Sequence, residues 1–176
     1  MQAFPTIFLL GYMGSGKSYT GRRLAELLHV PFVDLDRRIE EREGRSISRI
    51  VAEAGLPYFR QREAECLREL PARNTVVACG GGTPIYHDNL AWMNQRGITF
   101  YLDTPVAILA ERLTPEMAHR PLLQGLTAQD LPEFIKRHLS ERLPAYLGAH
   151  LRYAQSTGDE PIAQDIRNYL LRITGH

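Results

Sequence analysis

Short apolar runs alternate along the chain with longer stretches in which apolar residues recur at helical spacing. The short runs cover Thr6–Leu10, Pro31–Val33, Thr75–Cys79, Ile98–Leu102 and, more weakly, Leu151–Ala154. The first run is apolar almost throughout, which predicts a strand buried on both faces. Strands that alternate with helices are typical of an α/β protein.

The stretches with helical spacing predict eight helices: Lys17–Leu28, Asp36–Arg42, Ser46–Ala54, Leu56–Leu70, Asp88–Arg96, Pro105–Leu113, Ala128–Gly148 and Pro161–Ile173. Ser46 is expected to cap the third helix, and Gly55 is expected to end it. The helix 128–148 contains an internal proline at 144, which predicts a bend or break there. The segment Thr114–Thr127 loses periodicity and contains prolines and a glycine, so we expect a mobile loop.

Length and charge limit the classes of protein that remain. The 176 residues fit one domain, and 21 Lys+Arg against 20 Asp+Glu give a formal charge of +1. This balance argues against a protein that binds nucleic acid or membranes through bulk electrostatics. The apolar run at Ile7–Leu10 is far shorter than a membrane span and lacks the flanks of a signal peptide, so we interpret the chain as cytoplasmic. Cys66 and Cys79 are expected to be reduced and packed.

The strongest chemical signal is Gly11-Tyr-Met-Gly-Ser-Gly-Lys-Ser18, which fits G-x-x-x-x-G-K-[ST] between a predicted strand and a predicted helix. Glycines let the backbone wrap so that successive N–H groups point at phosphate oxygens, and the helix that follows adds its positive end. In such a loop Lys17 reaches the β- and γ-phosphates, and the Ser18 hydroxyl binds Mg²⁺. The motif therefore predicts a nucleoside triphosphate site.

Two carboxylates, Asp34 and Asp36, follow the second predicted strand. They lie on one face if the strand extends that far. One alternative is that they cap the next helix. The other is that they orient Mg²⁺-bound water or accept a proton from an attacking hydroxyl. Their spacing leaves both alternatives open.

Arg60 and Glu63 are three residues apart on a predicted helix and therefore share a face. Their spacing alone favours a solvated ion pair. Arg62 and Glu65 repeat the same spacing on another face, which shows how readily such pairs arise.

Gly80-Gly81-Gly82 follows a predicted buried strand. Three consecutive glycines carry a large backbone entropy penalty, which indicates that another group approaches the backbone closely. Arg112, Arg120 and Arg142 are each most simply solvated surface residues. Arg120 is the best candidate of the three for function, because an arginine on an irregular loop can close over a transferring phosphate.

Five motifs together carry a family resemblance. The P-loop, Asp-Leu-Asp at 34–36, Phe-Arg-x-x-Glu at 59–63, Gly-Gly-Gly-Thr at 80–83 and Arg-Pro-Leu-Leu at 120–123 occur in the order and spacing of shikimate kinase. The chain resembles that family from about Thr6 to Leu171. The resemblance implies a five-stranded parallel sheet flanked by helices in the nucleoside-monophosphate-kinase manner, in a single domain over residues 1–176 with a lid around 114–127. It also implies a monomer that uses ATP and Mg²⁺ to phosphorylate the 3-hydroxyl of shikimate.

The resemblance also implies roles for individual residues. The nucleotide site would comprise Gly14, Ser15, Gly16, Lys17, Ser18, Tyr19, Arg112, Arg120 and Gln155, and Ser18 with Asp34 would serve Mg²⁺. The shikimate site would comprise Asp36, Arg60, Glu63, Gly80, Gly81, Gly82 and Arg142. Lys17, Asp36 and Arg120 would be catalytic, with Asp36 the candidate general base. Arg60 and Arg142 would clamp the carboxylate, for which two-pronged guanidinium binding is suited.

Some positions depart from the family pattern. Tyr19 stands where the family usually has threonine, and Gln155 and Ser156 replace an expected basic position. Nucleotide affinity is therefore expected to differ. Two alternatives remain: a related kinase for a small molecule such as gluconate, and a regulatory module that binds ATP without turnover. ADP release that depends on an added acceptor would distinguish them.

Overall fold

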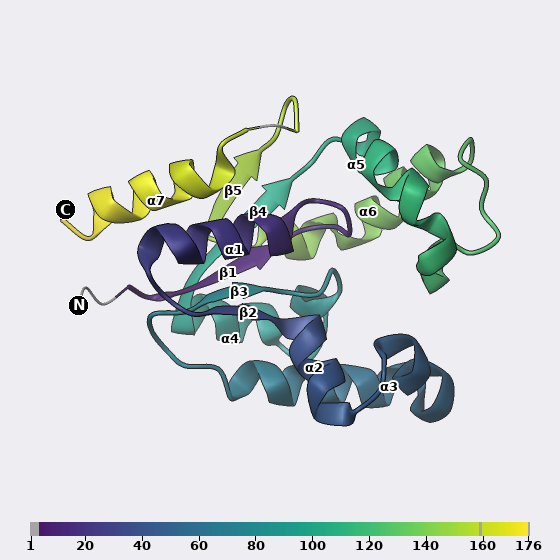
Figure 1. Ribbon diagram of the computed structural model, residues 1–176, viewed down its shortest axis with the longest axis horizontal. Helices are drawn as coiled ribbons and strands as arrows, with labels where there is room; N and C mark the ends of the chain where they lie inside the picture. Colours follow the sequence, from purple (N-terminus) through teal and green to yellow (C-terminus); the bar gives the residue numbers. More distant parts are fainter. Residues whose placement is uncertain (1–3, 159, 176) are drawn as a thin grey trace.

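The computed structural model describes residues 4–158 and 160–175 and contains one five-stranded sheet in the order β2-β3-β1-β4-β5 (Figure 1). The strands are β1 (Thr6–Leu10), β2 (Phe32–Asp34), β3 (Val76–Ala78), β4 (Gly97–Asp103) and β5 (Leu151–Ala154). Every neighbouring pair is parallel. The predicted fold class is confirmed.

Helices cover both faces of this sheet (Figure 1). They are α1 (Lys17–Leu28), α2 (Leu35–Glu43), α3 (Ile47–Arg68), α4 (Asn89–Arg96), α5 (Val106–Leu113), α6 (Leu131–Leu147) and α7 (Ile162–Ile173). Side chains of β1 alternate between two cores. Ile7 and Leu9 pack with α1 and α7, whereas Phe8 and Leu10 pack with helices α2 to α6. All five residues of β1 are buried, as the uninterrupted apolar run predicted.

The parallel arrangement brings the candidate motifs to one edge of the sheet. The P-loop leaves the carboxyl end of central β1, Asp34 ends β2, and the triple glycine follows β3 by one residue. Asp34 is in register with Ala78 on the neighbouring strand. Ligands of open parallel sheets bind at this carboxyl edge.

The break at Gly55 is confirmed, and the break at Pro144 is not. Gly55 interrupts α3 with φ 85° and ψ 161°, and the Ser46 side chain accepts a hydrogen bond from Arg49 N at 3.3 Å, as a cap does. In contrast, α6 continues past Pro144. Pro144 is exposed and lies in the last turn, where the carbonyl that it leaves unpaired can bond to water.

The segment 114–127 is more ordered than predicted. It forms two 3₁₀ helices, η2 (Thr114–His119) and η3 (Pro121–Leu123), and each has a proline in its first turn. A helix with three residues per turn does not produce the 3.6-residue period that marks an α-helix. Leu123 is 1% exposed and packs in the core. The start of α6 was placed three residues early, because Thr127 and Asp130 form a turn in which the Thr127 hydroxyl donates to Asp130 Oδ2 at 2.5 Å.

Two further expectations can be compared with the structure. Cys66 and Cys79 are free and buried, as predicted. Among the helices of the described residues, none combines the length and apolar character needed to cross a bilayer.

Candidate active site

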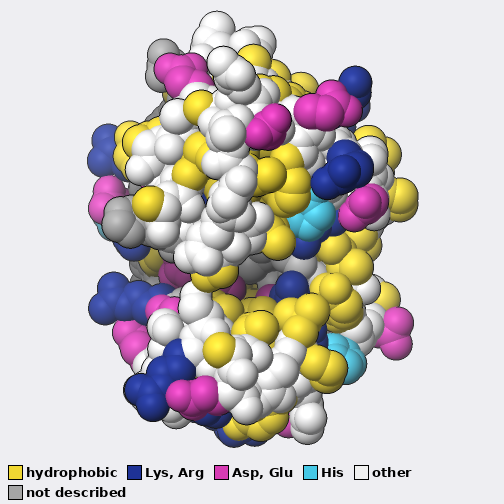
Figure 2. All heavy atoms as spheres, turned by 90° about the vertical axis from the view of Figure 1, so that its right-hand side faces the viewer, with side chains coloured by type: hydrophobic (Ala, Val, Ile, Leu, Met, Phe, Trp, Pro, Cys, Tyr) yellow, Lys and Arg dark blue, Asp and Glu magenta, His cyan; other side chains and the backbone are white. Residues whose placement is uncertain are grey.

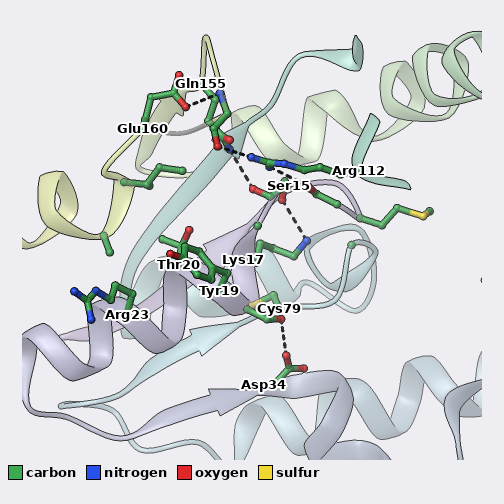
Figure 3. A pocket seen from close by; sticks show the side chains of 18 of the residues that line it. Ser15, Lys17, Tyr19, Thr20, Arg23, Asp34, Cys79, Arg112, Gln155 and Glu160 are labelled. Atoms are coloured by element: carbon green, nitrogen blue, oxygen red, sulfur yellow. Dashed lines mark hydrogen bonds between the residues drawn. The ribbon is translucent and has the colours of Figure 1, made fainter. Parts of the chain in front are cut away.

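A cavity of about 1130 Å³ opens at the carboxyl edge of the sheet. It is lined by the P-loop, by Asp34 and Asp36, by residues 79–81 and by residues that precede and begin α7. Figure 2 shows the right-hand side of Figure 1, where the molecule is hollowed between an upper and a lower part. In Figure 3 Lys17 lies near the centre of the cavity, with Arg112, Gln155 and Glu160 on one side and Asp34 on the other.

The P-loop has the backbone shape that its glycines predicted. Gly14 and Gly16 have φ values of 79° and 90°, and Gly11 has a φ of 146°. A Cβ on Gly11 would also lie 2.8 Å from Ser15 Oγ and 2.9 Å from Leu102 O. Gly16 caps α1 without a side-chain hydrogen bond, so the first N–H groups of that helix remain available at the cavity wall. This is a site for an anion.

Lys17 supplies the positive charge next to these N–H groups. Its Nζ donates to Gly11 O and Tyr12 O, each at 2.8 Å. Desolvation lowers its pKa to about 8, mainly because neutral carbonyls do not offset the loss of water around the ammonium. An arriving anion would therefore be strongly attracted to this side chain.

Asp34 caps α2, which is one of the two alternatives, and its carboxylate also pairs with the P-loop serine. Its Oδ2 accepts from the Ser18 hydroxyl at 2.6 Å, and its Oδ1 accepts from Arg37 N at 3.3 Å and so caps α2. One hydroxyl and one carboxylate match the protein ligands that Mg²⁺ uses when phosphates and water complete its shell. In the described part of the chain, no cluster of three or more His, Cys, Asp or Glu residues forms a metal cage.

Asp36 does not share a strand face with Asp34, because the strand does not extend as far as that arrangement required. The strand ends at Asp34, and Asp36 lies in the first turn of α2. Both carboxylates nevertheless line the cavity. Desolvation, followed by the nearby charges of Glu63 and Asp34, raises the pKa of Asp36 to about 6. A carboxylate with this pKa can accept a proton near neutral pH.

The Arg60–Glu63 pair is not solvated, although its spacing favoured that interpretation. Arg60 Nη1 lies 2.7 Å from Glu63 Oε2, and the exposed fractions of the two side chains are 13% and 0%. Glu63 Oε1 also accepts from the Thr83 hydroxyl at 2.6 Å. By contrast, Arg62 and Glu65, with the same spacing, are 28% and 38% exposed. The two pairs have the same spacing in the sequence, and tertiary packing buries only the Arg60–Glu63 pair.

The three glycines have different structural reasons. A Cβ on Gly80 would lie 2.7 Å from Asp36 Oδ1, and one on Gly82 would collide with the Arg60 guanidinium. For Gly81 the nearest atom to such a Cβ is Arg142 Nη1 at 3.5 Å, which is an ordinary contact. The three glycines predicted that another group lies close to the backbone. At Gly80 this group is the Asp36 carboxylate, and at Gly82 it is the Arg60 guanidinium. Gly81 lines the cavity with Gly80, whereas Gly82, Arg60, Glu63 and Arg142 lie outside its lining.

The remaining predicted residues lie at the P-loop end. Arg112 donates to Gly14 O at 3.2 Å and to Gly158 O at 2.6 Å, so it joins the P-loop to the segment after β5. Gln155 donates to Ser15 O at 3.1 Å. Tyr19 is 79% exposed at the rim. Arg120 lines the cavity but is paired with Glu116, to which its Nε donates at 2.8 Å.

Glu160 lines this end of the cavity and was not predicted. Its carboxylate accepts from Ser156 Oγ at 2.9 Å, Thr157 N at 2.6 Å and Gly158 N at 2.9 Å. Hydrogen bonds from the backbone N–H of Thr157 and, next in effect, from that of Ser156 lower the pKa of Glu160 to about 2. Most of these donors belong to the backbone, so the side chains in the sequence give little indication that Glu160 is held here. The spacing between Ser156 and Glu160 is the one feature that could have indicated it.

Fold and site together define a class of protein: a P-loop kinase with the nucleoside-monophosphate-kinase type of fold. Comparisons with known proteins narrow this class. The family model described as "Shikimate kinase" matches residues 13–173. A shikimate kinase from Bacteroides fragilis is 40% identical over 84% of this chain and 83% of its own length, and one from Parabacteroides distasonis is 38% identical over 95% and 98%.

Solved structures agree with these relatives. Shikimate kinase from Bacteroides thetaiotaomicron has a TM-score of 0.87 at 34% identity, covering 99% of this chain and 100% of its own. Shikimate kinase from Acinetobacter baumannii in complex with shikimate has a TM-score of 0.83 at 35% identity, covering 97% and 92%. The chain belongs to the shikimate kinase family.

Proposed function

We propose that the protein transfers the γ-phosphoryl group of ATP to the 3-hydroxyl of shikimate, giving ADP and shikimate 3-phosphate for chorismate and aromatic amino-acid biosynthesis. The observation that carries this proposal is the buried Arg60–Glu63 pair beside the triple glycine, with Arg142 next to Gly81. Two guanidinium groups next to a P-loop suit a small acceptor that bears a carboxylate. Family membership supports the same acceptor.

The nucleotide would be held mainly by the P-loop. Backbone N–H groups from Gly14 to Tyr19 and the Lys17 ammonium would bind the phosphates. Arg112 and Gln155 would border the base, because both fasten the segment after β5 to the P-loop. Arg120 would leave Glu116 and contact the transferring phosphate, where a cation offsets developing negative charge.

Ser18 and Asp34 would hold Mg²⁺, since the two side chains already meet at 2.6 Å at the cavity wall. The ion would supply charge neutralisation of the phosphates. The protein contributes a hydroxyl and a carboxylate in fixed positions. The backbone N–H of Arg37 donates to Asp34 Oδ1 and so keeps this carboxylate oriented.

The acceptor would bind with its carboxylate between Arg60 and Arg142, against the backbone of Gly80, Gly81 and Gly82. Glu63 keeps Arg60 oriented before the acceptor arrives. Asp36 would accept the proton of the 3-hydroxyl while the oxygen of that hydroxyl forms a bond to the γ-phosphorus. At the same time, the bond between the γ-phosphorus and the β–γ bridging oxygen would break. ADP leaves with the electron pair of that bond. Transfer would be direct and in line, so positioning and charge stabilisation provide the catalysis.

Residues 114–127 would act as a lid that excludes water from this reaction. We place the lid in a single domain of residues 1–176, and we propose that the protein works as a monomer in the cytoplasm. Light scattering of the purified protein with and without substrates tests the monomer. Hydrogen exchange of residues 114–127, slowed when both substrates bind, tests the lid.

Arg60→Ala tests the acceptor assignment. Removing one guanidinium from a buried carboxylate site is expected to raise the shikimate KM at least about 30-fold, with little change in the ATP KM. Arg62→Ala is the matched control, because Arg62 lies on the same helix and pairs instead with Glu43 and Glu65. An unchanged shikimate KM in Arg60→Ala would rule out this role for Arg60. NMR of the product, with phosphorus coupled to the proton on carbon 3, tests the position of transfer.

A further inference from the structure

The guanidinium of Arg60 is contacted by two aromatic rings. Its Cζ lies 4.5 Å from the centroid of the Tyr86 ring and 4.8 Å from the centroid of the Phe59 ring. Nη1 is paired with Glu63. Nε is buried and has no hydrogen-bond partner among the described residues. At least one N–H of this guanidinium is therefore without a protein acceptor among the described residues.

The two rings reach Arg60 from different parts of the fold. Phe59 precedes Arg60 on α3 and is 5% exposed, so it belongs to the core beneath the arginine. Tyr86 directly follows the 3₁₀ helix η1 (Thr83–Ile85) and is 36% exposed. Aromatic faces attract cations, so contacts with two rings restrict how the guanidinium can turn. Tyr86 is the ring that borders solvent.

The segment that carries Tyr86 is strained and firmly held. His87 and Asp88 are consecutive non-glycine residues with φ values of 51° and 53°. Arg68 donates to His87 O at 2.7 Å and to Asn89 Oδ1 at 2.8 Å. Such conformations persist only where their surroundings fix them, and they concentrate at functional sites.

The same segment fixes both members of the Arg60–Glu63 pair. Thr83 donates to Glu63 Oε1 at 2.6 Å, and Tyr86, three residues later, covers Arg60. The buried Asn89 amide donates to Thr83 O at 3.0 Å and so links the two ends of the segment. The segment 83–89 therefore holds the pair from its outer side, as α3 holds it from beneath.

We infer that Tyr86 is a positioning residue of the acceptor site: its ring, together with Glu63, holds the Arg60 guanidinium in the orientation that binds the carboxylate of the acceptor. This inference rests on the proposed function. It assigns specificity for a carboxylate-bearing acceptor to a residue outside the five sequence motifs. The aromatic ring matters for this role, and the phenol hydroxyl does not.

Steady-state kinetics of Tyr86→Ala, Tyr86→Leu and Tyr86→Phe test the inference. Loss of the ring is expected to raise the shikimate KM about 5- to 30-fold in the Ala and Leu variants, with kcat and the ATP KM within about twofold of wild type. Tyr86→Leu keeps apolar volume if Tyr86→Ala does not fold. Tyr86→Phe keeps the ring and is expected to retain the wild-type shikimate KM.

Tyr58→Ala is the matched control. Tyr58 is on α3, and its ring likewise contacts arginine guanidinium groups, those of Arg45 and Arg62. Its loss is expected to leave the shikimate KM unchanged. Calorimetric titration of shikimate without nucleotide should show the same weakening in Tyr86→Leu, which a purely structural role would not produce in a folded variant.

The outcomes separate the two claims. A wild-type protein that shikimate does not stimulate overturns the proposed function before any variant is compared. A wild-type protein active on shikimate, together with a folded Tyr86→Leu whose shikimate KM is unchanged, overturns only the role of Tyr86. A Tyr86→Phe variant as impaired as Tyr86→Leu also overturns it, because the hydroxyl would then be the essential group.

Discussion

The proposed nucleotide and acceptor sites hold their cations in different ways. At the nucleotide end, Lys17 donates to the carbonyls of Gly11 and Tyr12, and Arg112 donates to those of Gly14 and Gly158. At the acceptor end, Arg60 is paired with a fully buried carboxylate. Lys17 and Arg112 therefore have neutral partners, whereas Arg60 has a charged and buried one. Arg120, which also lines the nucleotide end, is paired with Glu116 at a more exposed position.

This difference indicates which site changes when substrates bind. A neutral carbonyl is a weaker partner for a cation than a phosphate is, so Lys17 and Arg112 can exchange partners when ATP arrives. Separating Arg60 from Glu63 would leave a buried charge unpaired, which is strongly unfavourable. We therefore expect Arg60 to keep its partner when the acceptor binds, whereas Lys17 and Arg112 exchange theirs when the nucleotide binds.

Lys17→Met should give the largest effect. Removal of the charge that faces the phosphates is expected to lower kcat at least about 10³-fold. The folded protein disfavours the Lys17 ammonium, whose pKa falls from 10.5 to about 8. Between pH 8 and pH 10.5 the unfolded chain therefore binds more protons than the folded protein. The contribution of Lys17 to stability should rise with pH from about 8 to 10.5, and it should be least favourable below pH 8.

At neutral pH Lys17→Met should therefore melt at a higher temperature than wild type and lack that rise with pH. Arg22→Met on the same helix is the control, because Arg22 does not line the cavity. A variant that melts lower, or that keeps its activity, contradicts the assigned role of Lys17.

Gly81→Ala should separate folding from acceptor binding. The added methyl meets nothing closer than 3.5 Å, so the melting temperature should stay close to wild type. The methyl points toward Arg142 in the acceptor site and is expected to lower kcat/KM for shikimate about 10- to 100-fold. Gly80→Ala is the contrasting variant, because its methyl would lie 2.7 Å from Asp36 Oδ1 and should destabilise the fold. Wild-type shikimate kinetics in Gly81→Ala would contradict this placement.

The pH dependence of kcat/KM tests Asp36. Its pKa is raised to about 6, so kcat/KM for shikimate should rise about tenfold per pH unit below 6 and level off above it. The pKa of Asp36 is 3.8 in the unfolded chain and about 6 in the folded protein, so the folded protein binds more protons between these two pH values. The contribution of Asp36 to stability therefore falls as the pH rises through this range. Asp36→Asn should remove both effects. A flat profile across this range would show that Asp36 ionisation is not required.

Glu116→Gln should give the smallest effect. The Arg120–Glu116 pair is exposed and spans one helical turn, so it adds little stability. Freeing Arg120 is expected to lower the ATP KM by about twofold at most. Glu133→Gln, which removes another exposed pair with Lys136, is the control. A higher ATP KM in Glu116→Gln would contradict the release of Arg120 toward the nucleotide.

The sequence predicted the nucleotide end better than the acceptor end for a physical reason. A P-loop is one contiguous segment whose glycines determine its shape, so its residues identify it directly. The acceptor end is assembled from α2, α3, residues 80–89 and α6. Arg60–Glu63 and Arg62–Glu65 have the same spacing, and only packing against Thr83 makes the first pair the buried one.

Other misses have similar causes. Tyr86 carries no local signal, because its position depends on Arg68 holding the backbone of His87. The sequence left open whether Asp36 shares a strand face with Asp34, because no pattern marks the residue at which the strand becomes a helix. The 3₁₀ helices between α5 and α6 are too short for a periodic pattern to reveal.

ADP release from the purified protein with Mg-ATP, measured with and without shikimate, is the direct test of shikimate phosphorylation. Gluconate and quinate serve as comparison acceptors. We expect strong stimulation by shikimate and none by the other two acceptors. Stimulation by gluconate instead would indicate a different acceptor site, and tight ATP binding without stimulation by any acceptor would indicate a regulatory module rather than an enzyme.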